Sequence, residues 1–267
     1  MKGLVALAAV VALSVAGCST GSTASPSGSP ASSSAASGAG PVNVVASTNV
    51  YGDIVKTIGG PAVAVTSIID SPEKDPHEYE ADARTQLALS KAQLVIENGG
   101  GYDEFVDTML KSARTKPTVI NVTDVSGLNQ HPADGEFNEH LWYDFPTVEK
   151  LAAQLVTELS AAAPGQAATF KSNAKAFTAQ LDQLQQDEVA IKGKHAGEGV
   201  AITEPVPLYL LEAAGLVNKT PEKFSEAIEQ DTDVSPAVLE ETENLFDTKQ
   251  VKLLAYNQQT TGPQTEA

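Results

Sequence analysis

The sequence is poor in cysteine, tryptophan and basic residues. Cys18 is the single cysteine of the 267 residues, so no internal disulfide can staple the fold. Only one tryptophan is present, which leaves little aromatic surface for stacking on a haem or cobalamin ring. Lys and Arg number 17 against 34 Asp and Glu, giving a formal net charge of −17. This acidity argues against binding to nucleic acid or to anionic lipid headgroups.

An apolar run at the N-terminus is too short to span a bilayer as a mature helix. Residues 3–15 are almost wholly apolar and follow Lys2, as in a secretory signal. The run leads into Ala16-Gly17-Cys18, which resembles a bacterial lipobox. We therefore predict a lipoprotein signal peptide over residues 1–18, with Cys18 acylated and anchored to the outer face of the membrane. The alternatives are an ordinary signal peptide and a buried free cysteine.

Residues 19–41 contain only Ser, Thr, Gly, Ala and Pro. Such a stretch has nothing to bury, and we predict a disordered tether. Its root-mean-square reach is on the order of 25 Å by random-coil scaling. The rest of the chain, residues 42–267, is long enough for two modest domains.

Short apolar runs alternate with helical patterns in the first part of this region. We predict strands at 42–46, 63–69, 94–97 and 118–122, and helices at 51–58, 83–92 and 102–113. This alternation indicates βαβ units and a mostly parallel sheet. We assign residues 42–145 to an N-terminal α/β lobe, with a loop over residues 123–140.

Two helical stretches follow, at 146–163 and 166–192, and we assign residues 146–194 to linking helices. The second carries an apolar stripe made of Phe170, Ala174, Phe177, Leu181 and Leu184. About 27 residues at 1.5 Å per residue give a helix about 40 Å long, which suits a backbone joining two lobes. The alternative is an ordinary amphipathic surface helix.

The pattern of strands and helices resumes after residue 195. We predict strands at 200–203 and 251–256, and helices at 205–214 and 235–246. A sheet of two or so strands is small, so we expect the C-terminal lobe, residues 195–267, to be incomplete. The predicted fold is α/β, with two lobes of mostly parallel sheet flanked by helices and joined by one long backbone helix.

Three candidate metal ligands stand at the ends of predicted elements. His77 lies in Asp75-Pro76-His77-Glu78-Tyr79-Glu80, His140 precedes an aromatic-rich helix start, and Glu204 ends the strand at 200–203. Open parallel sheets bind ligands beyond the carboxyl ends of their strands. Imidazole nitrogen and carboxylate oxygen suit Zn²⁺, Mn²⁺ and Fe²⁺. Glu204 could instead cap the following helix. The other histidines, His131 and His195, have no such setting, and we expect them to be solvent-exposed.

These motifs resemble those of the metal-binding solute receptors of bacterial ABC importers for zinc and manganese. The likeness covers nearly all of residues 42–267. Residues 75–80 resemble the family's Asp-Pro-His-x-Tyr-Glu motif, and Glu139-His140-Leu141-Trp142-Tyr143-Asp144 resembles its Asp-Pro-His-x-Trp-x-Asp motif. Residues 203–210 align with the turn that carries the family's third ligand. The resemblance implies His77, His140 and Glu204 as ligands, between two α/β lobes joined by one long helix.

Three departures from the family pattern stand out. Asn138-Glu139 replaces the family's Asp-Pro before the second histidine. The segment that carries the family's fourth ligand, an Asp or Glu, does not follow Tyr256, so we expect a truncated chain and assign no fourth ligand. The long histidine-rich loop of many zinc receptors is also absent, which favours manganese or a non-buffering zinc receptor. The metal itself stays open between Zn²⁺ and Mn²⁺.

The main functional hypothesis is binding without chemistry. The protein would capture the divalent metal outside the membrane, as a monomer, and deliver it to the transmembrane subunit of an ABC permease. One alternative is a zinc hydrolase with water in an open position, but the sequence has no His-Glu-x-x-His pair. A second is a surface adhesin or interaction lipoprotein. A third is a receptor for a siderophore, haem or cobalamin, against which three metal-type ligands at strand ends argue.

Overall fold

The computed structural model describes residues 40–71, 74, 76, 79–133, 135–258 and 262–266. The predicted signal peptide with Cys18, nearly all of the predicted tether, and His77 lie outside these residues. Within them, no helix combines the length and the hydropathy that crossing a membrane requires.

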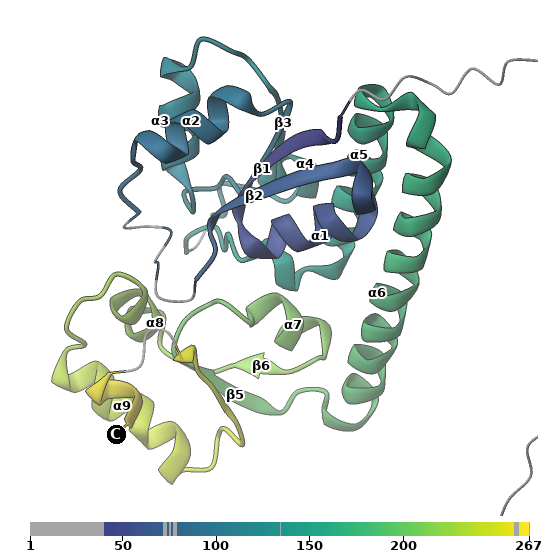
Figure 1. The fold of residues 1–267 in the computed structure, drawn as a ribbon. Coiled ribbons are helices and arrows are strands. Elements are labelled where there is room, and N and C mark those ends of the chain that lie inside the picture. The colour runs from purple at the N-terminus through teal and green to yellow at the C-terminus, as the bar shows by residue number, and fades with distance from the viewer. Residues whose placement is uncertain are drawn as a thin grey trace, which may run out of the picture. The chain divides into compact units, whose positions relative to one another are not determined.

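The first sheet contains four strands in the order β2-β1-β3-β4 (Figure 1). The strands are β1 (Val42–Thr48), β2 (Val63–Ile69), β3 (Leu94–Glu97) and β4 (Thr118–Asn121). Every pairing in this sheet is parallel, and Val44 lies in register with both Val65 and Leu94. The predicted parallel sheet is confirmed, and β2 and β3 have the predicted bounds.

Helices cover both faces of this sheet. They are α1 (Asn49–Gly59), α2 (Ala83–Lys91), α3 (Glu104–Ser112) and α4 (Val122–Ser126). Val44 and Ala46 face one core with α1, whereas Val45 faces a second core with Leu89 of α2 and Val106 of α3. The central strands β1 and β3 are buried on both faces, which explains their largely apolar sequences. Helix α4 occupies the start of the segment predicted to be a loop.

Two long helices follow, α5 (Phe145–Ala162) and α6 (Ala167–His195), with a 3₁₀ turn, η3 (Pro164–Gln166), between them. Helix α6 has 29 residues, so it is about 43 Å long. It contacts α1 and α5 near the first sheet and α7 (Leu208–Ala213) near the second (Figure 1). The predicted long helix is confirmed.

The apolar stripe of α6 is buried only in part. Phe170, Ala174 and Leu181 are buried, but Leu184 is 44% exposed. The buried side of the helix continues instead through Gln185 and Glu188. The expectation that Leu184 belongs to the stripe was wrong, because the helix buries polar side chains at this level and apolar periodicity does not detect them.

The second sheet has the order β6-β5-β7, again with parallel pairs. Its strands are β5 (Gly199–Ile202), β6 (Val217–Asn218) and β7 (Leu254–Ala255). The accompanying helices are α7, α8 (Glu222–Glu229), α9 (Pro236–Asp247) and α10 (Pro263–Glu266). Strand β6 and helix α8 were not predicted, and β7 covers only two residues of the predicted strand at 251–256.

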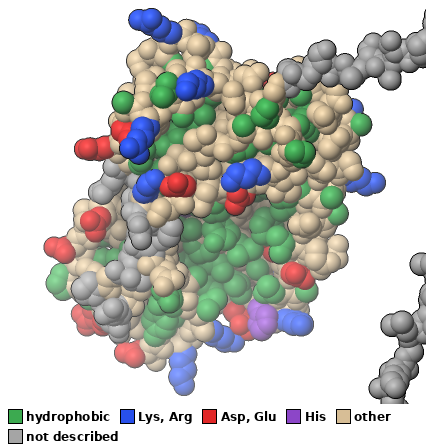
Figure 2. Space-filling model, viewed as in Figure 1, with side chains coloured by type: hydrophobic (Ala, Val, Ile, Leu, Met, Phe, Trp, Pro, Cys, Tyr) green, Lys and Arg blue, Asp and Glu red, His purple; other side chains and the backbone are tan. Residues whose placement is uncertain are grey.

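Apolar side chains gather on the surface over α7 and β6 (Figure 2). Val217 of β6 is 39% exposed. Carboxylates and basic side chains are scattered around this area rather than within it.

Candidate metal centre

His140 is a buried histidine held by rigid neighbours on both sides. It immediately precedes a 3₁₀ turn, η2 (Leu141–Tyr143), which leads into α5. The ring is 4% exposed, and Leu141 next to it is fully buried. The side chain of Asp144 accepts a hydrogen bond from the backbone N–H of Thr147 at 3.2 Å and so caps α5. This cap fixes the helix start against which the turn rests.

Two aromatic rings pack edge-on against the imidazole. The centroid of Tyr102 lies 5.8 Å and that of Trp142 5.2 Å from the His140 ring, with interplanar angles of 70° and 74°. Tyr51 packs against the Trp142 ring in turn, at 6.5 Å and 82°. These contacts restrict rotation of the ring and exclude water from its faces.

Asn138 determines the protonation pattern of the ring. Its Oδ1 lies 2.8 Å from Nδ1 of His140 and also accepts the backbone N–H of His140 at 3.1 Å. Its Nδ2 donates to the carbonyl of Pro205 at 3.1 Å, which identifies the oxygen end of the amide. An amide oxygen can only accept, so Nδ1 carries a proton, and in the neutral ring Nε2 then carries the lone pair that a metal needs.

A second buried amide fixes the residue before His140. The Nδ2 of Asn98 donates to the carbonyl of Glu139 at 3.0 Å, and its Oδ1 accepts from the hydroxyl of Tyr51. The carboxylate of Asp103 holds Asn98 by accepting its backbone N–H at 2.6 Å. Asn98 and Tyr51 have no exposed surface. The Glu139 backbone is therefore attached to the C-terminal end of β3.

Burial changes the acidity of this support. It raises the pKa of the Tyr51 hydroxyl well above its ordinary value, and the nearby Asp103 carboxylate adds to the effect. Burial also raises the pKa of Asp103, against the opposing effect of the hydrogen bonds that it accepts. Tyr51 stays a neutral donor at physiological pH, as its hydrogen bond to Asn98 requires.

Glu229 reaches this site from α8. The helix ends there in a Schellman motif, in which Thr232 N–H donates to the Ala227 carbonyl at 2.8 Å and Asp231 N–H to the Ile228 carbonyl at 3.1 Å. Asp231 adopts the left-handed conformation that this motif requires, with φ of 49°. Glu229 Oε1 lies 3.9 Å from Nε2 of His140, and its side chain is 22% exposed.

The three residues Glu139, His140 and Glu229 form a candidate metal site. Each offers one ligand atom, and these atoms all lie within 4.8 Å of one another. Two atoms bound to one tetrahedral Zn²⁺ are about 3.4 Å apart, given bonds of about 2.1 Å. The separation of 3.9 Å between His140 and Glu229 thus needs little contraction. One imidazole and two carboxylates suit Zn²⁺, Mn²⁺ or Fe²⁺.

The predicted ligand Glu204 is buried at the end of β5. It is 5% exposed and lies one residue beyond Thr203, which is also buried. The turn after Glu204 contacts the segment that carries Asn138 and His140, because Asn138 donates to the carbonyl of Pro205 and the hydroxyl of Tyr209 donates to the carbonyl of Asn138 at 2.7 Å. The group of three close ligand atoms found among the described residues contains His140 and not Glu204.

The remaining histidine predictions fall into two classes. His77 lies outside the described residues, so its place as a ligand stays a prediction. His131 and His195 are exposed, as expected. His195 lies 3.3 Å from a carboxylate oxygen of Glu198 near the surface.

Sequence reasoning missed Glu139 and Glu229 as candidate ligands. Glu139 had drawn attention only as a departure from a motif. Glu229 lies in a helix that was not predicted, although Pro221 and Glu222 at its start are helix-initiation signals. These signals could have located α8, but not its approach to His140.

The surroundings of the site are acidic. Burial raises the pKa of the Tyr209 hydroxyl to about 12, and the carboxylates of Asp144, Glu139 and Glu212 add to this rise. Burial likewise raises the pKa of Glu212 and, with help from Asp144, that of Glu188. Burial is the main cause of all three shifts, and the carboxylates near Tyr209 and Glu188 make the smaller contribution.

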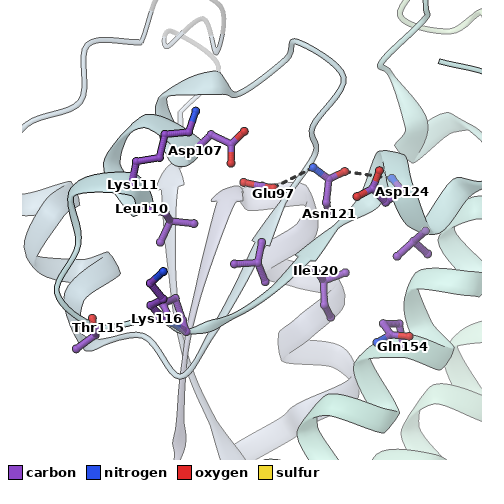
Figure 3. Close-up of a pocket in the computed structure, with 13 residues that line it drawn as sticks. Glu97, Asp107, Leu110, Lys111, Thr115, Lys116, Ile120, Asn121, Asp124 and Gln154 are labelled. Atoms are coloured by element: carbon purple, nitrogen blue, oxygen red, sulfur yellow. Dashed lines mark hydrogen bonds between the residues drawn. The ribbon is translucent and has the colours of Figure 1, made fainter. Parts of the chain in front are cut away.

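A separate cavity of about 830 Å³ lies beside β4 (Figure 3). Glu97, Asp107 and Asp124 line it together with Lys111, Lys116 and the apolar Leu110. Glu97 accepts a hydrogen bond from Nδ2 of Asn121 at 2.9 Å, and Oδ1 of Asn121 accepts the backbone N–H of Asp124 at 3.1 Å. Burial raises the pKa of Glu97 to about 7.

Comparison with known sequences places most of the chain in one family model. Residues 44–267 match the model described as zinc-uptake complex component A, periplasmic (ZnuA). The manganese-binding lipoprotein MntA of Halalkalibacterium halodurans is 27% identical over 177 residues, which cover 66% of this chain and 55% of that protein. The manganese ABC transporter substrate-binding lipoprotein PsaA of Streptococcus pneumoniae is 28% identical over 152 residues, covering 54% and 49%. The chain thus spans about half the length of these curated relatives.

Solved structures share the arrangement of two parallel sheets and a long helix. Zinc-bound AdcA from Streptococcus pneumoniae matches with a TM-score of 0.68 and 19% identity, over 85% of this chain and 48% of that one. The laminin-binding adhesin Lmb from Streptococcus agalactiae matches with a TM-score of 0.70 and 19% identity, over 84% of each chain. The predicted fold class is confirmed by this likeness.

Proposed function

We propose that this chain, which belongs to the periplasmic zinc-uptake component A family, is the solute-binding component of an ABC importer for a divalent transition metal. The cargo would be Zn²⁺ or Mn²⁺, captured outside the cell and passed to the transmembrane subunit of a permease. The protein would bind its cargo without changing it chemically, as a monomer.

The observation that carries this proposal is the state of His140. Its ring is buried, its Nδ1 faces an acceptor, and its Nε2 is directed towards a carboxylate. A buried imidazole with one nitrogen fixed by a hydrogen bond is the usual preparation of a metal ligand. This arrangement prepares His140 to bind a metal ion, and it supplies no step of covalent chemistry.

The proposed ligands are His77, His140 and Glu204. His140 supplies Nε2, and Glu204 supplies a hard carboxylate oxygen from the end of β5. His77 would come from the segment after β2, next to the carboxyl edge of the first sheet. In this proposal the ligands would come from segments that follow strands of both sheets, where parallel α/β proteins commonly bind their ligands.

The wider organisation is proposed on the same basis. Residues 1–18 would direct export, Cys18 would carry the lipid, and residues 19–41 would tether the protein above the membrane. Residues 42–145 and 195–267 would form the two lobes, with residues 146–194 linking them. The names of the relatives MntA and PsaA describe those proteins as lipoproteins, which supports an extracytoplasmic, lipid-anchored location.

Metal titration of the full chain tests the function. We expect Zn²⁺ or Mn²⁺ to bind at a 1:1 ratio and to raise the melting temperature, because a ligand that binds only the folded state stabilises it. His140→Ala should abolish tight binding. His131→Ala is the matched control, since His131 is exposed, and it should bind like the wild type.

A wild-type chain that binds neither ion, or a His140→Ala variant that binds as tightly as the wild type, would overturn the proposal. His77→Ala and Glu204→Gln test the other two ligands in the same assay. Retained affinity in either variant removes that residue from the ligand set.

A further inference from the structure

We propose that the edge of the first sheet at which its strands begin docks on an anionic phospholipid surface. We call this surface the basic edge, and its charged side chains are those of Lys91, Arg114, Lys116, Lys171 and Lys175. The proposal rests on the lipid-anchored location in the proposed function, and it adds the surface by which the folded part meets the membrane. The net charge of the chain predicted no such contact, but the charges are unevenly distributed.

Acidic side chains are absent from the stretches of sequence that pass through this edge. Acidic residues outnumber basic ones by 34 to 17 in the whole chain. The stretches without Asp or Glu are residues 40–52, 54–69, 83–96, 108–123 and 159–181. They contain the starts of all four strands of the first sheet and the turn between α5 and α6. Carboxylates stand instead near the strand ends, at Asp70, Glu97 and Asp124.

Three exposed basic residues lie together on one side of the edge. Lys91 ends α2, and Arg114 and Lys116 lie in the connection from α3 to β4. The hydroxyl of Thr115 donates to the carbonyl of Ser90 at 2.9 Å, which holds this connection beside the end of α2. Within the described part of the chain, none of the three forms an ion pair. Their charges are therefore available to an external anion.

Two exposed lysines extend the basic edge across the other face of the sheet. Lys171 and Lys175 lie in the first turns of α6. Asn173, between them, donates to the carbonyl of Ile58 at 3.0 Å. Ile58 lies near the end of α1, shortly before β2 begins. The start of α6 is thus held at the same end of the sheet as the starts of its strands.

Two other basic residues near this end are left out because carboxylates lie beside them. Lys56 forms an ion pair with Asp53 at 3.1 Å. The side chain of Lys111 runs towards Asp107 at the cavity beside β4 (Figure 3). The basic edge therefore keeps five cations that the protein itself does not neutralise.

The chain enters the fold at the basic edge. The backbone N–H of Gln93 donates to the carbonyl of Asn43 at 2.9 Å, and the N–H of Asn43 donates to the side chain of Gln93 at 3.0 Å. Gln93 follows Lys91 by two residues, and β1 begins at Val42. A lipid on Cys18 therefore holds this edge close to the membrane, within the tether's reach of about 25 Å. The opposite edge, where the cargo site is proposed, then faces away from the lipid.

Distance protects this contact from the acidity of the remaining surface. Strand β1 has seven residues, so the opposite edge of the sheet is about 23 Å away at about 3.3 Å per residue. The Debye length at physiological ionic strength is about 8 Å, so exposed carboxylates at that edge hardly act on lipid at the basic edge. Each Lys or Arg near an anionic surface strengthens binding about fivefold.

The first experiment measures binding of the full chain to vesicles that contain phosphatidylglycerol and to vesicles of phosphatidylcholine alone. We expect tighter binding to the anionic vesicles, weakening as salt is raised. Combining Lys91→Gln, Arg114→Gln and Lys116→Gln should reduce the affinity for anionic vesicles about a hundredfold. The matched control combines Lys194→Gln, Lys219→Gln and Lys223→Gln, which change the net charge equally at exposed sites elsewhere. Melting temperatures establish that both variants fold.

The second experiment locates the surface that meets the lipid. A fluorophore is attached through Thr118→Cys, an exposed position at the start of β4, in a Cys18→Ser background. The vesicles contain phosphatidylglycerol and a phospholipid with a quencher on its headgroup. We expect strong quenching there and weak quenching through Ser235→Cys, an exposed position before α9. The N-terminal segment is the same in both proteins.

The outcomes separate docking from metal binding. Preference for anionic vesicles that only the basic-edge variant loses, with stronger quenching at position 118, supports the proposal. Equal binding to both kinds of vesicle, equal losses in the two variants, or equal quenching at the two positions overturns it. Binding to double-stranded DNA as tight as to anionic vesicles also overturns it, because the edge would then select no lipid. Metal titration of the basic-edge variant should match the wild type, and failure of the wild type to bind metal would overturn the transport function alone.

Discussion

The side-chain oxygen of Asn138 accepts two hydrogen bonds from His140, one from the backbone N–H at 3.1 Å and one from ring Nδ1 at 2.8 Å. The same amide donates to the carbonyl of Pro205 at 3.1 Å. One side chain thereby fixes the ring, its tautomer and its place beside the Glu204 turn. The residues Asn138-Glu139, which depart from the family motif, still provide an orienting partner for the histidine.

Removing this orienting oxygen should weaken metal binding without removing a ligand. We expect Asn138→Ala to lose about 10- to 100-fold in affinity for Zn²⁺ or Mn²⁺, the usual effect of losing such a partner. Asn138→Asp keeps the acceptor for Nδ1 and should recover most of the loss. Titration of both variants checks this, and ring ¹⁵N shifts of His140 report the tautomer. Equal affinity in Asn138→Ala and the wild type would contradict the assignment.

The long helix offers a matched pair of leucines for a test of packing. Leu181 is 6% exposed and Leu184 is 44% exposed. Leu181→Ala should lower the free energy of unfolding by about 2–5 kcal/mol, because it removes buried methyl groups and leaves a cavity. Leu184→Ala should change it by less than about 0.5 kcal/mol. Denaturant unfolding measures both values, and equal losses would mean that α6 is packed with a different face inward.

Glu97 should make stability depend on pH. Its pKa in the folded protein is about 7, against an ordinary value of 4.5. The folded state therefore holds the proton more tightly, and the contribution of Glu97 to stability is complete below pH 4.5 and is lost as pH rises to about 7. Glu97→Gln keeps an acceptor for Asn121 and does not titrate, so this variant should escape the loss.

We expect Glu97→Gln to match the wild type near pH 4 and to exceed it above pH 7. The gain should be on the order of 1 kcal/mol, after allowance for solvent screening of a group beside an open cavity. Denaturant unfolding across this range measures the difference, and Glu241→Gln, an exposed site on α9, serves as control. A difference that does not vary with pH would show that the pKa of Glu97 is the same in the folded and the unfolded protein.

The sequence predicted well those strands that stand out as short runs between clear breaks. Strands β2 and β3 were found with their observed bounds, although β3 is buried throughout and β2 is fully buried only at its C-terminal end. Strand β6 has only two residues, too few for any periodicity. Leu184 was misplaced because α6 turns the polar Gln185 and Glu188 inward at that level.

The candidate site was predicted only where a motif marked it. His140 stands beside aromatic residues whose order is distinctive, and it proved to be buried. Glu229 has no distinctive neighbours in the chain, and only the path from β6 through α8 brings it to His140. Contacts between segments that are remote in sequence depend on the angle of a short helix, which local propensities do not determine.

Asn98 is a position at which a substitution is expected to abolish the proposed function without removing a proposed ligand. Its fully buried side chain accepts one hydrogen bond and donates two, to Gly99 and Glu139. Aspartate offers no donor there, leucine offers nothing, and glutamine is one bond too long. A diverged copy of this chain could therefore retain every ligand and still be inactive. An inventory of ligand residues alone would not distinguish that copy from a working one.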